Sequence, residues 1–511
     1  MKPSAEPMSM RIPIVFKEGD ADLQAAVAGS MAAARTAQPA WSATPLARRL
    51  ELIRELRHLI ATHALQLAEG SASARGRPAL ESLTAEVLPL AEACRFLERE
   101  AKRILAPRRL GRTGLPLWLS GVRSEVSREP FGVILVIGPG NYPLLLPGVQ
   151  IIQALAAGNA VLLKPGLGGM AVAQALCELI TSAGFDPQLV KLLPESPAAA
   201  IAAIAARPDK VLFTGSAATG ENILGQLAPQ IIPAAMELSG CDAVILRADA
   251  DLDLVVKALA FGLTLNDGAT CMSPKRVFVP PTIATELEGR LARRFAASRV
   301  PTRASRASLT ETERLSRLGP LLDEALARGA HFVAGGETGS GDSIFPIVLA
   351  GVHPSSRLMR EDLFAPVLAI LTVADDDEAI SRANDCPFAL GASIFSRDER
   401  AARRLAARLV AGMVAINDLI IPTADARLPF GGRNRSGFGV TRGAEGLLEL
   451  TTVKVVTVCR GRFRPAFDAP QPRDELIFDA YLNFTHGRSF ASRSRAFLAL
   501  IGRLSRRPNS S

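Results

Sequence analysis

The sequence predicts an α/β fold divided into at least two lobes. Apolar runs of four to eight residues recur along the chain and are separated by helix-length stretches, a pattern typical of buried parallel strands alternating with helices. The chain has 511 residues, more than a single hydrophobic core usually serves. Its apolar share of 48% and its charged share of 21% are those of a globular protein.

Two amphipathic helices are predicted before the first sheet. Residues 46–68 and 80–105 carry Leu, Ile and Val at helical spacing among charges, as at Leu52 and Leu56. Both are therefore expected to cover one face of a sheet. The following stretch, 112–130, is rich in turn residues, and we interpret it as an arm between these helices and the first sheet.

The predicted strands fall into two series. The first consists of short apolar runs at 132–137, 160–164, 190–193, 210–213 and 243–246. The second consists of runs at 276–280, 366–373, 391–395 and 412–417. The second series indicates another α/β lobe, which begins after about Ser239.

Cysteine spacing and apolar runs indicate the compartment. No two of the six cysteines form a CxxC pair, which argues against a disulfide framework or a zinc site and leaves one of them as a candidate reagent; they are Cys94, Cys177, Cys241, Cys271, Cys386 and Cys459. No run reaches the ~18 apolar residues of a membrane span, and the N-terminus lacks the apolar stretch of a secretory signal. We therefore expect a cytoplasmic protein.

The net charge of +9 is concentrated at the end of the chain. After Ala480 there is no acidic residue but six arginines: Arg488, Arg493, Arg495, Arg503, Arg506 and Arg507. The rest of the chain carries only +3, so the charge does not indicate nucleic-acid binding. Apolar residues alternate with the arginines from Gly487 to Arg507. This pattern is more often that of a helix packed on the body or a flexible tail, and peripheral contact with an anionic membrane is the alternative.

Six motifs occur in an order and at spacings that resemble the aldehyde dehydrogenase superfamily. They are GPGNYP (138–143), FTGSAATG (213–220), MELSGCD (236–242), NDGATCMS (266–273), MREDLFAPV (359–367) and LPFGGRNRSGFG (428–439). The resemblance runs from about Ile14 to Val456. Each motif is weak alone, but six in register are specific, and the last block is most similar to the branch that oxidises apolar aldehydes.

The resemblance implies a particular domain organisation. It implies a Rossmann-like dinucleotide-binding domain at 12–111 and 126–238, a second α/β catalytic domain at 239–425, a small oligomerisation arm at 112–125 and 426–458, and a basic tail at 459–511. It also implies a homodimer or homotetramer. We predict its contacts in the 112–130 stretch and in the strand LTTVKVV (450–456).

Aldehyde oxidation needs a nucleophile, because an aldehyde carbon is a poor hydride donor until a thiolate has added to it. By resemblance, the nucleophile is Cys271, which lies in a turn-rich passage before a strand. A lone cysteine is more often a small buried apolar residue. We interpret the competing Cys241 in that way, since it stands where the family usually has lysine.

Two further residues are candidates for catalysis. Asn141, in the turn after the first predicted strand, is expected to donate its amide to the oxyanion, with the Cys271 backbone N–H as a second donor. Glu237 ends the strand PAAMEL, 34 residues before Cys271 as in the family. Apolar neighbours raise a carboxyl pKa toward the range of a general base, so Glu237 is expected to activate the water that hydrolyses a thioester.

A dinucleotide site is expected beside these residues. Gly215 and Gly220 lie between a strand and a helix, where backbone amides can approach a pyrophosphate. By resemblance, the other cofactor-binding residues are Lys164, Ser216, Leu238, Glu361 and Phe364.

The chain departs from the family pattern at several positions. Leu167 replaces a glutamate that would repel a 2′-phosphate, so the choice between NAD and NADP stays open, with a slight preference for NAD. Gly140 stands where many relatives have tryptophan, which is expected to widen the substrate tunnel for a bulkier aldehyde. The remaining departures remove no reacting group; they are Ser239, Cys241, Ala269 and Ala365.

Two other functions stay open. One is a CoA-acylating aldehyde dehydrogenase or acyl-CoA reductase, against which the retained Glu237 argues because it favours release of a free acid. The other is a catalytically silent binding subunit. A silent copy has no reason to keep the whole set of predicted reacting and cofactor-binding residues, so we favour an enzyme that acts on a small-molecule aldehyde.

Overall fold

A computed structural model describes residues 20–116, 119, 121–296, 311–335, 346–460, 467, 469, 471 and 474–504. The chain forms two compact units. The first comprises Met1–Arg108 and Val126–Val455, and the second comprises Arg109–Glu125 and Val456–Ser511. All residues predicted to take part in catalysis or cofactor binding belong to the first unit.

The first unit contains a six-stranded sheet whose order is β17-β7-β6-β3-β4-β5. Its strands are parallel except the short edge strand β17. Their bounds are β3 Val133–Ile137, β4 Ala160–Lys164, β5 Val190–Leu192, β6 Lys210–Thr214, β7 Ala234–Glu237 and β17 Gly437–Phe438. The chain runs outward from β3 to β4 and β5, then returns to β6 on the other side of β3. This reversal makes the gap between β3 and β6 the topological switch point of a doubly wound sheet.

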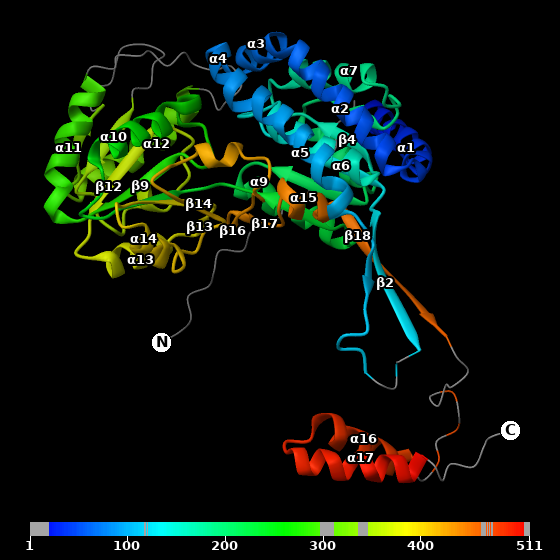
Figure 1. Ribbon diagram of the computed structural model, residues 1–511. Helices are drawn as coiled ribbons and strands as arrows, with labels where there is room; N and C mark the ends of the chain where they lie inside the picture. Colours follow the sequence, from blue (N-terminus) through cyan, green and yellow to red (C-terminus); the bar gives the residue numbers. More distant parts are fainter. Residues whose placement is uncertain are drawn as a thin grey trace, which may run out of the picture. The chain divides into compact units, whose positions relative to one another are not determined.

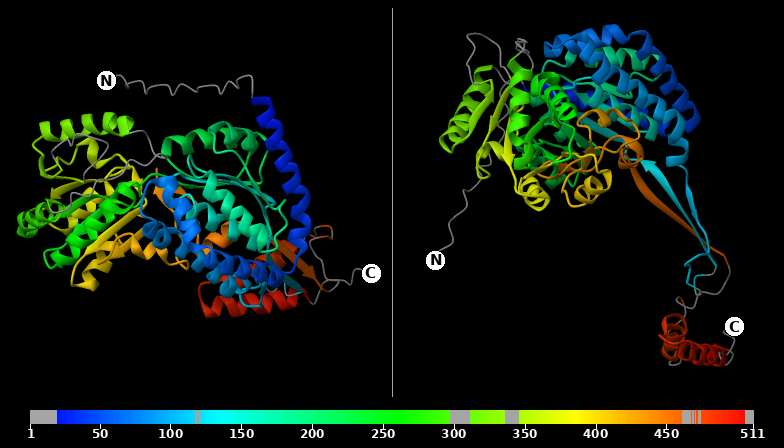
Figure 2. Two further views of the ribbon diagram at one scale, coloured as in Figure 1. Left: turned by 90° about the horizontal axis from the view of Figure 1, so that it is seen from above. Right: turned by 60° about the vertical axis from the view of Figure 1, so that its left-hand side comes forward.

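Helices cover this sheet because its strands are apolar on both faces. Right-handed crossovers place the helices before and after the reversal on opposite faces. α6 (Leu145–Ala157) packs on β3 and β4 with α2 (Leu46–Thr62) and α5 (Leu88–Ile104) behind it, whereas α1 (Asp20–Ala43) packs with α8 (Pro197–Ala205). Figure 1 shows α1, α2, α5 and α6 close to β4, and Figure 2 shows this blue and cyan part of the chain from two other sides.

The remaining helices of this part complete the α/β alternation. They are α3 Ala64–Arg75, α4 Ala79–Ser82, the π-helical turn η1 Leu83–Val87, α7 Met170–Ser182, α9 Ala217–Leu227 and α15 Gly443–Glu449. The helix predicted at 46–68 is divided near His63 into α2 and α3, and the one predicted at 80–105 forms α4, η1 and α5 in succession.

A second sheet in the same unit has the order β10-β11-β12-β9-β8-β14-β15 and is parallel except at β10. Its strands are β8 Asp242–Leu246, β9 Pro274–Val279, β10 His331–Ala334, β11 Ile347–Ala350, β12 Val367–Thr372, β14 Gly391–Phe395 and β15 Met413–Ile416. Alternate side chains enter different cores: Ile245 packs in the cluster that includes α12, α13 and α14, and Val244 in the one that includes α10 and α11. This alternation follows from the two-residue period of a strand.

The helices on this second sheet are α10 Leu252–Thr264, α11 Pro281–Ala296, α12 Glu311–Ala327, α13 Asp376–Asn384 and α14 Glu399–Ala406. The nine strands of the two predicted series are all present, with ends shifted by at most two residues. The run at 243–246, which falls in the first predicted series, forms β8 of the second sheet. The expected α/β fold with a Rossmann-like sheet and a second α/β sheet is confirmed. The proposed boundaries between domains stay a prediction.

A three-stranded sheet contains parts of the two segments predicted to form the arm. Its order is β1-β2-β18, with bounds Arg108–Leu110, Val122–Pro130 and Thr451–Cys459. The second unit contains a helical hairpin, α16 (Asp474–His486) and α17 (Phe490–Leu504), in which the ring centres of Phe484 and Phe497 lie 5.0 Å apart. Within the described residues, no helix combines the length and the apolar character needed to cross a membrane.

Candidate active site

Three strand ends of the first sheet converge at its switch point. Because β3, β6 and β7 are parallel neighbours, their carboxyl ends lie at the same edge. The turn after β3 carries Asn141, Gly215 follows β6, and Glu237 is the last residue of β7. Residues from separate motifs therefore meet in one crevice.

The loop that carries Cys271 comes from the second sheet. After α10 the backbone turns back through Asn266, Asp267 and Gly268, which have φ values of 51°, 54° and 70°. A Cβ at Gly268 would lie 2.5 Å from the Pro366 nitrogen, so only glycine fits this close approach. The reversal places Cys271 just before β9.

Two cavities meet at Cys271. The apolar cavity, of about 590 Å³, is lined mainly by hydrocarbon side chains that include Leu145, Phe261, Met272 and Ile420. The polar cavity, of about 600 Å³, contains Asn141, Glu237 and the strand ends of the first sheet. Cys271 lines both cavities, so its sulfur can face one molecule in each.

The resting state of Cys271 follows from its surroundings. Burial, with the negative charges of Asp242 and Glu237, raises the pKa of the Cys271 thiol to about 12. Arg442 acts in the opposite direction. At neutral pH the thiol is therefore protonated in this structure, and it must lose its proton when it reacts.

Glu237 is held by two hydroxyl groups. Thr214 Oγ1 donates to one carboxylate oxygen at 3.1 Å, and Thr441 Oγ1 donates to the other. The side chain is buried. Burial raises the pKa of Glu237, while both hydroxyls and the charge of Arg442 partly offset that increase. The raised pKa is the property that a general base needs near neutral pH.

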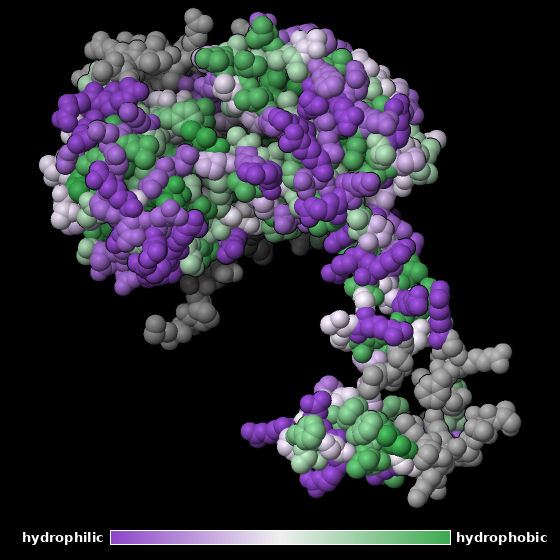
Figure 3. Space-filling view, in the orientation of Figure 1, coloured by the Kyte–Doolittle hydropathy of each residue, from purple (hydrophilic) through white to green (hydrophobic). Residues whose placement is uncertain are grey.

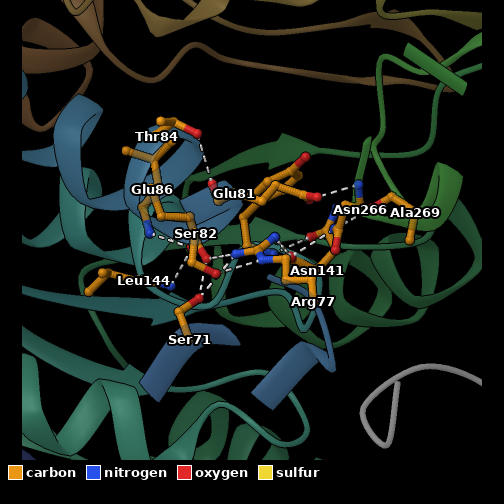
Figure 4. Close-up of polar contacts among 12 residues, drawn as sticks. Ser71, Arg77, Glu81, Ser82, Thr84, Glu86, Asn141, Leu144, Asn266 and Ala269 are labelled. Carbon is orange, nitrogen blue, oxygen red and sulfur yellow. Dashed lines mark hydrogen bonds and ion pairs between the residues drawn. The ribbon is translucent and has the colours of Figure 1, made fainter. Parts of the chain in front are cut away.

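Asn141 joins the turn after β3 to the Cys271 loop (Figure 4). Its Nδ2 donates to the carbonyl oxygen of Ala269 at 3.1 Å, and its Oδ1 accepts from the Tyr142 N–H at 3.0 Å. The expected donor atom therefore lies against the backbone two residues before Cys271. An amide keeps its donor at every pH, which suits it to binding an oxyanion.

The polar cavity has features that fit a dinucleotide. The side chain of Ser216 caps the N-terminus of α9. A Cβ at Gly215 would collide with the Phe213 ring, so only glycine fits here and no side chain covers its backbone. Such a helix N-terminus favours a phosphate. Glu361 and Phe364 line the same cavity, and Glu361 is paired with a neighbouring arginine at 2.7 Å.

The structure brings most of the predicted site residues into this cavity. Asn141, Gly215, Ser216, Glu237, Leu238, Cys271, Glu361 and Phe364 all line it. Lys164 and Gly220 are not among its lining residues. Lys164 ends β4, where burial lowers the pKa of its amine, and a Cβ at Gly220 would lie 2.6 Å from Leu238, so this glycine permits close helix–strand packing.

Two departures from the family pattern are placed by the structure. Gly140 lines the polar cavity and not the apolar one. The absence of a tryptophan at this position therefore widens the polar cavity, and not the apolar cavity where the widening was expected. Cys241 is buried, and its thiol faces the Met359 carbonyl oxygen at 3.8 Å. This environment agrees with its interpretation as a packing residue.

Sequence reasoning missed the residues that hold the reactive groups. Thr214 and Thr441 donate hydrogen bonds to Glu237. The positive charge of Arg442 lowers the pKa of both Glu237 and Cys271. Arg77, which is paired with Glu86, donates to the Asn141 carbonyl oxygen. Thr441 is 204 residues from Glu237. No local pattern marks such a contact, although the SGFG motif lies just before it.

Comparisons with known proteins identify the family. The model of the aldehyde dehydrogenase family matches residues 12–456. A 4,4'-diapolycopene aldehyde oxidase from Methylomonas sp is 32% identical over 82% of this chain and 78% of that protein. A putative NADP(+) succinate-semialdehyde dehydrogenase from Mycolicibacterium smegmatis is 31% identical over 85% of this chain and 84% of that protein.

A solved structure shows the same architecture. Betaine aldehyde dehydrogenase from Staphylococcus aureus, in complex with NAD+, aligns with a TM-score of 0.79 at 26% identity and covers 88% of this chain and 90% of that one. This chain belongs to the aldehyde dehydrogenase family. It is therefore an oxidoreductase of a family that depends on nicotinamide dinucleotides.

Proposed function

We propose that this enzyme oxidises a bulky apolar aldehyde to a carboxylic acid through a thiohemiacetal and a thioester on Cys271. The observation that carries the proposal is the position of Cys271 where an apolar cavity meets a polar cavity lined by Asn141 and Glu237. The aldehyde enters from the apolar side, and the dinucleotide occupies the polar side.

The reacting groups act in sequence. The Cys271 thiol loses its proton to water in the cavity, and its sulfur bonds to the carbonyl carbon. The resulting oxyanion accepts hydrogen bonds from Asn141 Nδ2 and the Cys271 backbone N–H. A nicotinamide dinucleotide held by Gly215, Ser216 and Glu361 would supply the acceptor for the hydride of this carbon. Glu237 then takes a proton from water, whose oxygen attacks the thioester, and the acid is released as the Cys271 thiol re-forms.

The lining of the apolar cavity supports the substrate class. Its walls include Leu145, Phe261, Ile420 and Phe430, and its volume is about 590 Å³, within the range of pockets that enclose drug-sized ligands. The Methylomonas relative is named for a 4,4'-diapolycopene aldehyde, which is consistent with an apolar substrate. We propose NAD as the preferred cofactor. NADP should also be accepted, because Leu167 offers no carboxylate to repel its 2′-phosphate.

A spectrophotometric screen tests the proposed substrate and cofactor. Aliphatic aldehydes of increasing chain length and aromatic aldehydes are supplied with NAD and with NADP, and the reduced cofactor is followed. We expect kcat/KM to rise by about threefold or more with each buried methylene. Higher activity with short charged aldehydes would contradict the substrate class. Activity that requires coenzyme A would favour the acylating alternative, and reduction of neither cofactor would favour a silent binding subunit.

The assembly and location of the protein are also proposals. We propose a cytoplasmic homodimer or homotetramer whose subunits meet through 112–130 and β18. Four valines of β18 are half exposed in the single chain, which supports this proposal; they are Val453, Val455, Val456 and Val458.

We also propose that the hairpin α16–α17 contacts an anionic membrane surface. Phe490, Leu498 and Ile501 are 87%, 70% and 49% exposed and share one side of α17, because their spacings are close to whole helical turns. Figure 3 shows apolar and polar patches beside each other on this hairpin. The described part of α17 carries Arg493, Arg495 and Arg503 and no acidic residue, a composition suited to anionic lipid.

Vesicle flotation tests this contact. The full-length protein is expected to float with vesicles that contain phosphatidylserine and not with neutral phosphatidylcholine vesicles. A variant with Phe490, Leu498 and Ile501 changed to serine is expected to remain at the bottom of the gradient. Because Ile231 is an isolated exposed residue, Ile231→Ser should float like the wild type. Equal flotation of the triple variant would exclude the proposed face.

A further inference from the structure

We propose that Arg77 and Glu86 form a buried ion pair that positions Asn141 and Cys271 for reaction. The inference rests on the proposed role of Asn141 in binding the oxyanion. Neither Arg77 nor Glu86 lines either cavity, so neither is placed to touch substrate or cofactor. Their contacts lead instead to the two loops that carry the reactive groups.

Glu86 fixes the start of α6, the helix that follows the Asn141 turn. Its Oε2 accepts hydrogen bonds from the backbone N–H groups of Leu144 and Leu145 at 2.8 and 2.9 Å. The first N–H groups of a helix have no partner within the helix, and the residue before α6 is a leucine, whose side chain cannot accept one. Glu86 therefore acts as a cap from a distant segment, with its negative charge at the favourable end of the helix dipole.

Arg77 balances this buried carboxylate and reaches the turn itself. The side chains of Arg77 and Glu86 are 2% and 0% exposed, and a buried charge is tolerated only when it is paired and hydrogen bonded. Arg77 also donates to Ser82 Oγ at 2.8 Å and to the Asn141 carbonyl oxygen at 3.4 Å. Its guanidinium lies 5.1 Å from the centre of the Tyr142 ring. Figure 4 shows Arg77 between Asn141 on one side and Ser82 and Glu86 on the other.

The same turn is bound to the Cys271 loop. Tyr142 Oη and Thr270 Oγ1 are hydrogen bonded at 2.7 Å, and Thr270 directly precedes Cys271. Asn266 Nδ2 donates to the Asn141 carbonyl oxygen at 3.0 Å. A shift of the turn would therefore move the amide donor relative to the sulfur, and a misplacement of about 1 Å can cost about 100-fold in rate.

A double-mutant cycle distinguishes positioning from general stability. We expect Glu86→Ala to lower kcat by about 10- to 100-fold, with little change in KM for the cofactor. The isotope effect on kcat with aldehyde deuterated at the carbonyl carbon should increase, because hydride transfer becomes rate-limiting. If Glu86 acts through Asn141, the Glu86→Ala/Asn141→Ala enzyme should be no slower than Asn141→Ala alone.

A second buried carboxylate provides a matched control. Glu98 on α5 pairs with Arg57 on α2 at 2.6 Å, and its side chain is 9% exposed. Glu98→Ala should lower the melting temperature while leaving kcat and the isotope effect unchanged. If Glu86→Ala does not fold, Glu86→Gln replaces it in the cycle, because its amide oxygen can still accept from the α6 N–H groups but the charge that holds Arg77 is lost.

The outcomes separate this inference from the proposed function. Rate losses from Glu86→Ala and Asn141→Ala that multiply, or a folded Glu86→Ala enzyme with unchanged kcat, would overturn the positioning role. In both cases the oxyanion-binding role of Asn141 would stand. An Asn141→Ala enzyme with full activity would instead remove that role, and the positioning proposal with it.

Discussion

Glu237→Gln is expected to lower steady-state turnover by about 10²- to 10⁴-fold, the usual contribution of a general base, while sparing the first round of cofactor reduction. Hydride transfer precedes hydrolysis, so the variant should give a burst of reduced cofactor close to one per active site and then nearly stop. Gln keeps the shape of the side chain and one acceptor oxygen for the hydroxyls of Thr214 and Thr441, and the hydroxyl that faces the amide nitrogen can turn to accept from it. Stopped-flow absorbance measures the burst and the slow phase separately.

The pH dependence of the wild-type enzyme provides a control for this role. Because burial raises the pKa of Glu237, the carboxylate form needed for hydrolysis is lost as the pH falls through that raised value. Hydrolysis of the wild-type thioester should therefore increase with pH and reach a plateau, whereas the slow phase of Glu237→Gln should lack this rise. A variant that loses the burst together with turnover would show that Glu237 acts before hydride transfer.

Cys271→Ala is expected to lower both the burst and steady-state turnover by about 10⁴-fold or more, as removal of a covalent nucleophile usually does. No other thiol lines either cavity, so none within the described residues can replace it. Cofactor binding, followed by quenching of protein fluorescence, should change little because the sulfur contributes only a small part of the cavity wall.

Cys241→Ala is the matched control. Cys241 lies close in sequence to Ser239, which lines the polar cavity, but Cys241 itself is buried and lines neither cavity. The variant should retain most of the wild-type turnover at temperatures where it is folded. If Cys241→Ala abolished the burst and Cys271→Ala did not, the assignment of the nucleophile would be reversed.

The strands could be predicted from sequence because each is a short apolar run buried on both faces. Several elements were missed, and for four of them the reason can be identified. β10 has exposed and half-buried residues and lacks a clear alternation, β11 is only four residues long, and β17 contains only Gly437 and Phe438. α1 is weakly amphipathic and contains Pro39, so its periodicity does not stand out.

The site was predictable where a residue belongs to a motif and not where its role depends on a distant contact. Asn141, Glu237 and Cys271 lie in glycine-rich turns or at a strand end and line one cavity. Glu86 lies on a short π-helical turn and reaches Leu144 across 58 residues. Such a contact is fixed only when helices pack on the sheet, and spacing along the chain does not reveal it.

During turnover the aldehyde is expected to become covalently joined to Cys271. The most direct test of this covalent step is mass spectrometry of Glu237→Gln enzyme after one turnover with aldehyde and cofactor, followed by peptide mapping. We expect a mass increase equal to the acyl group, located on the peptide that contains Cys271 and absent from a Cys271→Ala/Glu237→Gln enzyme. An enzyme that reduces cofactor in the burst yet carries no adduct, or carries it on another residue, would contradict this expectation.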